Sequence, residues 1–273
     1  MALIKIDENK CKKDGFCIRE CSATILQPGE KGFPEIISGG DAVCLECGHC
    51  VAVCPHGALS HARIPMESSP AIREELRIDE ERAAQFLRSR RSIRHFLEKP
   101  VEKEKIKRLI EVARYAPTAG NSQMVEWLVL ADKNRVRDLA ALAVDWLREI
   151  VKNPQVIAAS PYLPLAVSSW DAGFDSILRG APAVVVAMAS KEAINGMVDL
   201  TLALSYLDLF APILDLGTCW AGLLQGAMIH SALVKKAVGV PEDYPHHYPL
   251  MLGYPAVKFH RLPERQTPKI SYV

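Results

Sequence analysis

The sequence has almost no net charge, no compositional bias towards disorder and no uninterrupted apolar run of membrane length. Its 33 Lys and Arg residues balance 32 Asp and Glu residues, a net charge of +1, so no overall field favours nucleic acid or acidic lipid. Hydrophobic residues make up 49% and charged residues 24% of the 273-residue chain, which excludes a disordered protein. The longest apolar stretch, Met197 to Gly217, is interrupted by Asp199, Asp208 and Asp215, which makes it a poor membrane span.

Further absences narrow the possible functions. Residues 1–15 carry acids and lysines where a signal peptide would need an apolar core, so we expect a cytoplasmic protein without membrane or nucleic-acid partners. No loop of the G-x-G-x-x-G or G-x4-G-K-[ST] type occurs, which argues against a dinucleotide-binding Rossmann domain and a P-loop. Cysteine is nearly absent after residue 54, because seven of the eight precede residue 55 and only Cys219 follows. In a reducing compartment such crowded cysteines favour metal ligation over disulfides.

The second cysteine group has the spacing of an iron–sulfur motif. Cys44, Cys47, Cys50 and Cys54, followed by Pro55, read C-x2-C-x2-C-x3-C-P, as in bacterial ferredoxins, where the fourth cysteine of one motif serves the other cluster. Zinc is the competing metal, since C-x2-C pairs also hold tetrahedral zinc. Zinc needs two pairs of ligands, whereas three cysteines at steps of three, followed by C-P, favour an iron–sulfur cluster.

The first cysteine group fits the same spacing with one replacement. Cys11, Cys17 and Cys21 keep their places, and Asp14 stands where the missing cysteine would be. A carboxylate is a harder and weaker ligand for this iron than a thiolate, so this site is expected to hold a [4Fe-4S] cluster with one labile iron, or a [3Fe-4S] cluster. The alternative is that Asp14 is an ordinary turn residue that does not bind iron.

The two motifs together predict two ligand sets in one small domain. They form an internal quasi-repeat with an offset of 44 − 11 = 33 residues. Residues 1–63 are predicted to be a two-cluster ferredoxin-type domain, and residues 64–75 a linker rich in Pro and Ser. Exchange of the fourth ligand gives one set of Cys11, Asp14, Cys17 and Cys54, and another of Cys21, Cys44, Cys47 and Cys50.

Residues 76–273 are predicted to form an α+β sheet domain with flanking helices, because helical and strand patterns mix without regular βαβ alternation. Apolar spacing predicts helices over Glu81–Ser89 and from Pro100 onward. Asp199–Leu214 is apolar almost all round, which predicts a helix buried on several sides, in a core or a subunit interface. Apolar runs predict strands at Glu126–Ala131, Ala183–Ala189 and Leu250–Gly253.

Three separated segments of this domain could hold a phosphorylated planar cofactor such as FMN. RRSIRHF (90–96) offers guanidinium groups and a hydroxyl for a phosphate, APTAGNSQ (116–123) offers amides for a heterocycle edge, and residues 253–265 carry further cations. Taken singly, the first also fits a solvated helix end and the second an ordinary turn.

The order of these segments resembles the nitroreductase superfamily. RRSIRHF, APTAGNSQ before a strand, LRGAPAVVV, LGTCWAG and LGYP with a basic tail follow one another over residues 85–273, and the N-terminal module makes the chain similar to the ferredoxin-fused branch. The resemblance implies a homodimer with FMN in the interface. It implies FMN contacts from Arg90, Arg91, Ser92 and Arg94, from Pro117, Thr118, Asn121 and Gln123 of the other subunit, from the Gly222 backbone near the flavin N5, and from Lys258, Arg261 and Arg265 at the phosphate.

Two departures from the family pattern concern substrate choice. Gln123 is followed by Met124-Val125-Glu126-Trp127, whereas family members commonly have Gln-Pro-Trp. Residues 145–181 are a long segment between strands that is expected to cover the flavin as a lid and so to select the acceptor.

The resemblance implies an FMN-dependent, nitroreductase-like oxidoreductase, and the oxygen lability of iron–sulfur clusters favours an anaerobic host. Electrons would pass from a ferredoxin, flavodoxin or nicotinamide donor through the clusters to FMN, and on to a nitroaromatic, a quinone or a similar small electrophile. One alternative is a specific reductive dehalogenation or enoate reduction. Another is a non-enzymatic electron relay to a protein partner. No catalytic residue is assigned.

Overall fold

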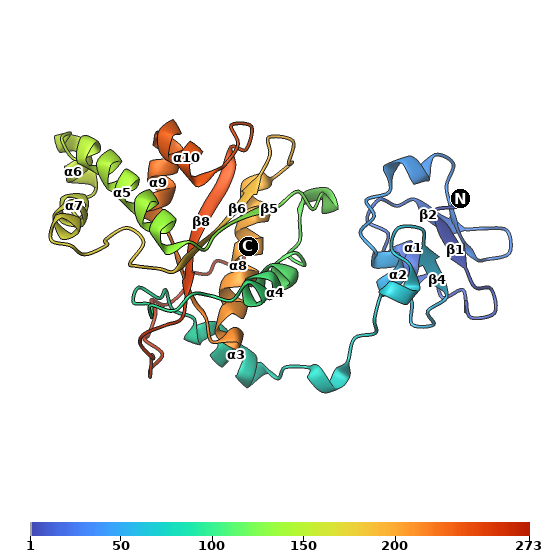
Figure 1. Ribbon diagram of the computed structural model, residues 1–273. Helices are drawn as coiled ribbons and strands as arrows, with labels where there is room; N and C mark the ends of the chain where they lie inside the picture. The colour runs from blue at the N-terminus through green and yellow to red at the C-terminus, as the bar shows by residue number, and fades with distance from the viewer. Residues whose placement is uncertain (1) are drawn as a thin grey trace. The chain divides into compact units, whose positions relative to one another are not determined.

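The computed structural model describes residues 2–273, which form two compact units (Figure 1). The first unit runs to Ile78 and includes Gly120–Ser122; the second comprises Asp79–Ala119 and Gln123–Val273.

The first unit repeats one small pattern twice. Its helices α1 (Phe16–Arg19) and α2 (His49–Ala52) each follow a left-handed glycine, Gly15 at φ 71° and Gly48 at φ 73°. The helices start 49 − 16 = 33 residues apart, the same offset as the two cysteine motifs. Antiparallel pairs join β1 (Ile4–Ile6) to β4 (Leu59–His61) and β2 (Leu26–Pro28) to β3 (Pro34–Ile36). Short 3-10 turns lie at Gly40–Val43 (η1), between β3 and α2, and after β4 at Met66–Ser68 (η2) and Glu74–Leu76 (η3).

The second unit is built on a four-stranded antiparallel sheet in the order β5-β6-β8-β7. The central strand β6 (Ala183–Ala189) is buried along its whole length, as expected from its continuous apolar run. The other strands are β5 (Glu126–Leu130), β7 (Gly217–Trp220) and β8 (His246–Gly253).

Helices cover both faces of this sheet (Figure 1), and successive residues of β6 therefore enter two cores. Val184 and Val186 pack with one set of helices, and Val185 and Ala187 with the other. The first set is α5 (Lys133–Ile150), α7 (Leu163–Asp171), α9 (Gly222–His230) and α10 (Ala232–Val238); the second is α4 (Lys103–Ala113) and α8 (Gly196–Phe210).

Two helices begin at residues other than those predicted. Helix α3 (Glu80–Ser89) starts one residue early because Asp79 caps it and accepts from the Arg82 N–H at 2.9 Å. The prediction that the next helix opens at Pro100 is wrong, since α4 begins at Lys103. Val101 is buried in the core and the Leu97 N–H donates to the Tyr254 carbonyl, so tertiary contacts keep this stretch out of the helix.

The segment 145–181 contains the end of α5, then α6 (Pro154–Ala159) and α7. Leu147, Leu163 and Leu178 are buried in the core. These positions serve the fold, while Tyr162 and Phe174 are exposed.

Helix α8, followed by the 3-10 turn η5 (Ala211–Leu214), is buried on one side only. Leu200, Leu204 and Leu207 pack against the sheet, whereas Val198 is 56% and Tyr206 41% exposed. Among residues 2–273, Gly196–Leu214 is the one helical stretch whose length and composition would suit a membrane span, a test that core helices of soluble proteins also pass.

Candidate functional site

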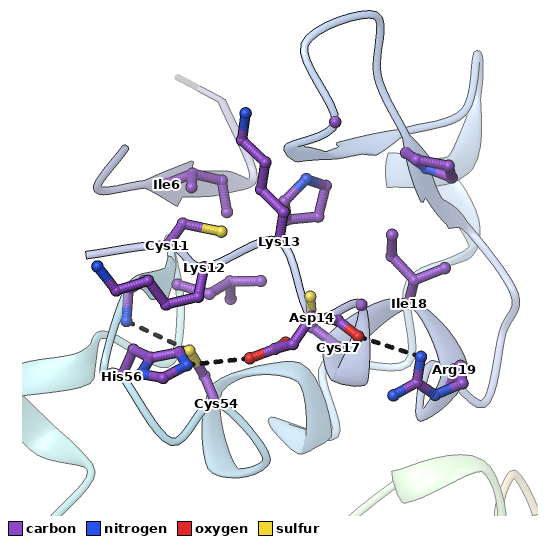
Figure 2. Close-up of a pocket in the computed structure, with 16 residues that line it drawn as sticks. Ile6, Cys11, Lys12, Lys13, Asp14, Cys17, Ile18, Arg19, Cys54 and His56 are labelled. Atoms are coloured by element: carbon purple, nitrogen blue, oxygen red, sulfur yellow. Dashed lines mark hydrogen bonds and ion pairs between the residues drawn. The ribbon is translucent and has the colours of Figure 1, made fainter. Parts of the chain in front are cut away.

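In the first unit, one cavity of about 290 Å³ is lined by side chains from both cysteine motifs. Cys11, Asp14 and Cys17 come from the first motif and Cys54 from the second. Figure 2 shows these side chains around the cavity. The structure thus brings together one complete predicted ligand set, including the cysteine exchanged between the motifs.

Asp14 is held at the rim of this cavity by protein contacts. Its Oδ2 lies 3.1 Å from Nε2 of His56 (Figure 2). Its Oδ1 accepts from the Phe16 N–H at 3.3 Å. Asp14 therefore lies among the predicted ligands and also accepts a hydrogen bond within the turn before α1, so both alternatives from the sequence stay open.

A second, narrower cavity of about 30 Å³ is lined by the other predicted set, Cys21, Cys44, Cys47 and Cys50, and by His61. The Cys44 Sγ accepts the Glu46 N–H at 3.5 Å and lies 3.7 Å from Nε2 of His61. Burial lowers the pKa of His61.

Burial, with a smaller contribution from neighbouring thiols, raises the pKa of several of these cysteines. Burial raises the pKa of Cys50 to about 11, with a further contribution from the charge of Cys47. Burial also raises the pKa of Cys17, to which Cys54 and Cys11 contribute. Thiolates packed this closely repel one another, and a bound cationic centre would relieve that repulsion.

In the described part of the chain, no group of three or more His, Cys, Asp or Glu side chains is placed to hold a single metal ion.

In the second unit, the segment after α3 is pinned at both ends. The Ile93 N–H donates to the Thr218 carbonyl of β7 at 2.8 Å, and the Ala256 N–H donates to the His95 carbonyl at 2.9 Å. Gly217 allows this close approach, because a Cβ there would lie 2.3 Å from Ile93 Cγ1. The RRSIRHF residues are thus fixed between β7 and the chain that follows β8.

Two cavities are lined by some of the residues that are predicted to bind the FMN phosphate. One of about 240 Å³ is lined by Arg90, Arg91 and Lys258 together with Thr218. A neighbouring one of about 350 Å³ is lined by Arg90, Arg91 and Arg265. Neither cavity is lined by Arg261, which is exposed in the C-terminal tail.

The two arginines at these cavities differ in their partners. Arg90 Nη1 lies 3.6 Å from Oδ2 of Asp208. Arg91 Nη1 donates instead to the main-chain carbonyls of Arg88 and Arg90, at 2.9 and 2.7 Å.

Ser92 and Arg94 are placed near the buried thiol of Cys219. Burial raises the pKa of this thiol, while the charge of Arg94 and the hydroxyl of Ser92 act in the opposite direction. Cys219 is 4% exposed, in keeping with a structural cysteine.

The loop predicted to approach the flavin is shaped by left-handed residues. Asn121 has φ 53° and Gln123 φ 51°, and the Gln123 N–H donates to the Thr118 hydroxyl at 3.0 Å. Pro117 is exposed beside them. None of the four residues lines the two arginine cavities. Gly222 begins α9, with its backbone exposed.

Three polar residues of these sites were missed by sequence reasoning. Asp208 pairs with Arg90 and also accepts from Thr218 Oγ1 and Trp220 Nε1. Asp199 accepts from the Ala119 N–H at 3.0 Å, and its Oδ2 is buried without a hydrogen-bond partner in the described residues. An aspartate inside an otherwise apolar helix is a signal that could have identified both, because a buried carboxylate needs a partner. His61 had no comparable signal.

Comparisons with known proteins identify the family of this chain. The model of the Nitroreductase family matches residues 87–254, more than half of the chain, and the chain belongs to that family. No protein among curated sequences matches it.

Solved structures share the fold of the second unit at low sequence identity. A nitroreductase with bound FMN from Bacteroides fragilis is 18% identical with a TM-score of 0.59, covering 72% of this chain and 100% of its own. One with bound FMN from Desulfitobacterium hafniense is 20% identical with a TM-score of 0.55, at 72% and 100% coverage. A BluB-like flavoprotein from Clostridium difficile is 20% identical with a TM-score of 0.54, at 68% and 94% coverage.

Proposed function

We propose that the protein is an FMN-dependent oxidoreductase whose first unit holds two iron–sulfur clusters and supplies electrons for reduction of a small organic electrophile, a nitroaromatic or a quinone. Family membership supports the flavin part. The observation that carries the cluster part is the sorting of the predicted ligands into two cavities, three from one motif and one from the other in each.

The donor set fits iron–sulfur clusters better than zinc. A cubane binds each thiolate to a different iron, so its ligands surround a volume instead of meeting at one ion. Zinc draws four ligands to about 2.0–2.3 Å of one centre. Cys21, Cys44, Cys47 and Cys50 line one cavity, and three of them come from the C-x2-C-x2-C-x3-C-P motif, whose spacing favours the cluster.

The basic cavities fit a phosphate. Arg91 and Lys258 would bind it, and Arg265 would close the neighbouring side, because guanidinium groups pair well with phosphate oxygens. Arg90 would contribute less charge, since Asp208 already pairs with it. FMN supplies two-electron chemistry and iron–sulfur clusters supply single electrons when each is bound.

A second copy of the chain would cover the exposed apolar side of α8. Val198, Leu202 and Tyr206 are exposed there, as expected for a subunit interface. Sedimentation of the wild-type protein should give a dimer, and Leu202→Glu should shift it towards the monomer. Leu233→Glu, at an exposed leucine of α10, is the matched control and should leave the dimer intact.

Cofactor content tests the proposal directly. After anaerobic purification of the full chain, iron, acid-labile sulfide, zinc and FMN are measured per chain, together with the absorption spectrum. We expect one FMN and about eight irons for two cubanes, or about seven if the Asp14 site holds three. Zinc without flavin would contradict the proposal. Anaerobic turnover with a nitroaromatic or quinone, using ferredoxin, flavodoxin or nicotinamide as the donor, then identifies the reaction.

A further inference from the structure

His61 is a buried polar residue of the first unit to which neither the ligand sets nor the flavin chemistry gives a role. It is the last residue of β4, opposite Ile4 of β1, and only 3% of it is exposed. Its ring lines the second cavity beside Cys44. The strand pairing therefore fixes a hydrogen-bonding side chain against one predicted cluster ligand.

The backbone of Arg63 determines which ring nitrogen carries the proton. Its N–H lies 3.2 Å from His61 Nδ1, so Nδ1 acts as the acceptor. In a neutral imidazole one nitrogen accepts and the other is an N–H donor, which places the proton on Nε2. That nitrogen lies 3.7 Å from the Cys44 sulfur, within reach of an N–H···S hydrogen bond.

Two donors thus converge on one sulfur, since the Glu46 N–H also reaches Cys44 Sγ at 3.5 Å. Hydrogen bonds to ligand sulfurs are among the factors that set the reduction potential of a cluster. They favour the state with more negative charge on sulfur, which is the reduced state, because hydrogen bonds to charged acceptors are the stronger ones. Their presence raises the potential.

The internal repeat lacks this donor at the other cavity. Subtracting the offset, 61 − 33 = 28 and 44 − 33 = 11, matches His61 to Pro28 and Cys44 to Cys11. Pro28 lines the first cavity, but a proline side chain has no hydrogen to donate. The pairing of a histidine with a ligand sulfur is therefore a second difference between the two sites, beside the replacement of a cysteine by Asp14, because the histidine of the first cavity, His56, contacts the Asp14 carboxylate instead.

We propose that His61 is a positioning residue that acts through Cys44 to raise the reduction potential of the cluster in the second cavity. The inference rests on the proposed function, because it requires that cluster. It assigns to one side chain a difference between the two sites that is separate from the Asp14 replacement.

The test is a potentiometric titration of the anaerobically purified full chain, monitored by electron paramagnetic resonance after iron and sulfide have been counted. His61→Phe keeps a buried ring without a donor, and should lower one cluster potential while leaving the other in place. His61→Gln keeps an amide donor and should give a smaller shift. His230→Phe is the matched control, because His230 is an exposed histidine at the end of α9 that lines neither cysteine cavity, and it should shift neither potential.

The outcomes separate this inference from the proposed function. Wild-type protein without iron and sulfide would overturn both. Full iron content with unchanged potentials in His61→Phe would overturn the role of His61 alone, as would an equal shift of both clusters. Should His61→Phe lose iron, His61→Leu against His61→Gln makes the same comparison, and equal potentials in that pair would also overturn it.

Discussion

Arg90 and Asp208 form a partly buried ion pair, with Nη1 of the arginine 3.6 Å from Oδ2 of the aspartate. Asp208 lies inside α8 and is 5% exposed. The same carboxylate accepts from Thr218 and Trp220 of β7. One side chain therefore ties the arginine segment, the sheet edge and the central helix together.

Removing this carboxylate charge should destabilise the second unit. Asp208→Asn leaves Arg90 without its counter-charge, and we expect a loss of about 2 kcal/mol in the free energy of unfolding. Urea denaturation at neutral pH with saturating FMN measures it. Asp171→Asn removes the partner of Arg148 on the surface and should cost much less, since exposed pairs contribute little. Equal losses in the two variants would contradict the structural role of Asp208.

The phosphate assignment predicts an effect on flavin affinity. Lys258→Met removes one cation from the cavity that Arg91 shares, and should raise the Kd for FMN about tenfold, the loss of one charged hydrogen bond. Fluorescence titration of the apoprotein measures the Kd. Lys107→Met, on an exposed position of α4, should leave it unchanged. If Arg261→Met weakens FMN while Lys258→Met does not, the phosphate lies nearer the tail than these cavities.

His247 should make stability sensitive to mild acid. Its Nδ1 lies 3.2 Å from Gln225 Oε1 inside the fold, and burial lowers the pKa of its ring to about 4 from 6.5. Between these values the unfolded chain binds the proton more tightly, so stability is unaffected above pH 6.5 and falls as the pH drops towards 4. The full shift corresponds to about 3 kcal/mol.

The variant His247→Gln isolates this dependence, because glutamine can keep the contact with Gln225 but does not titrate in this range. Chemical denaturation at several pH values should show that the gap between wild type and variant changes between pH 6.5 and 4. His95→Gln, at an exposed histidine, is the control. If its stability relative to wild type shows the same pH dependence, the effect does not come from His247.

The Asp14 site predicts a gain of iron. Asp14→Cys restores the thiolate that the motif spacing calls for, and should stabilise a four-iron cluster in the first cavity. Iron content should rise from about seven to about eight per chain, or a labile iron should become resistant to chelators. Asp41→Cys, in the exposed turn η1, controls for an added thiol. An unchanged spectrum and unchanged iron lability in Asp14→Cys would exclude Asp14 as a ligand.

Sequence reasoning succeeded where a pattern is local. The apolar run Ala183–Ala189 predicts β6 to the residue, because a strand buried on both faces needs no polar alternation. The α+β class of the second unit follows from the same reading. The spacing of the cysteine motifs also anticipates the two groups that line the cavities, since each motif is a short loop with few possible geometries.

It failed where distant contacts decide. Val101 enters the core and delays α4, which the proline at position 100 alone would have started. The segment 145–181 is expected to cover the flavin, and no local pattern shows that Leu147 and Leu163 within it are core residues. The pairing of Arg90 with Asp208 spans more than a hundred residues, and no local pattern contains it.

The crossed arrangement of the cysteine motifs makes the first unit indivisible. Each half of the repeat contributes lining residues to both cavities. Cys21 of the first half lines the second cavity, and Cys54 of the second half lines the first. A fragment ending between the halves would leave two incomplete cavities rather than one complete site. One half of the repeat could therefore complete a cavity of this geometry only by associating with a second copy of itself. In the present chain the two halves associate within one molecule.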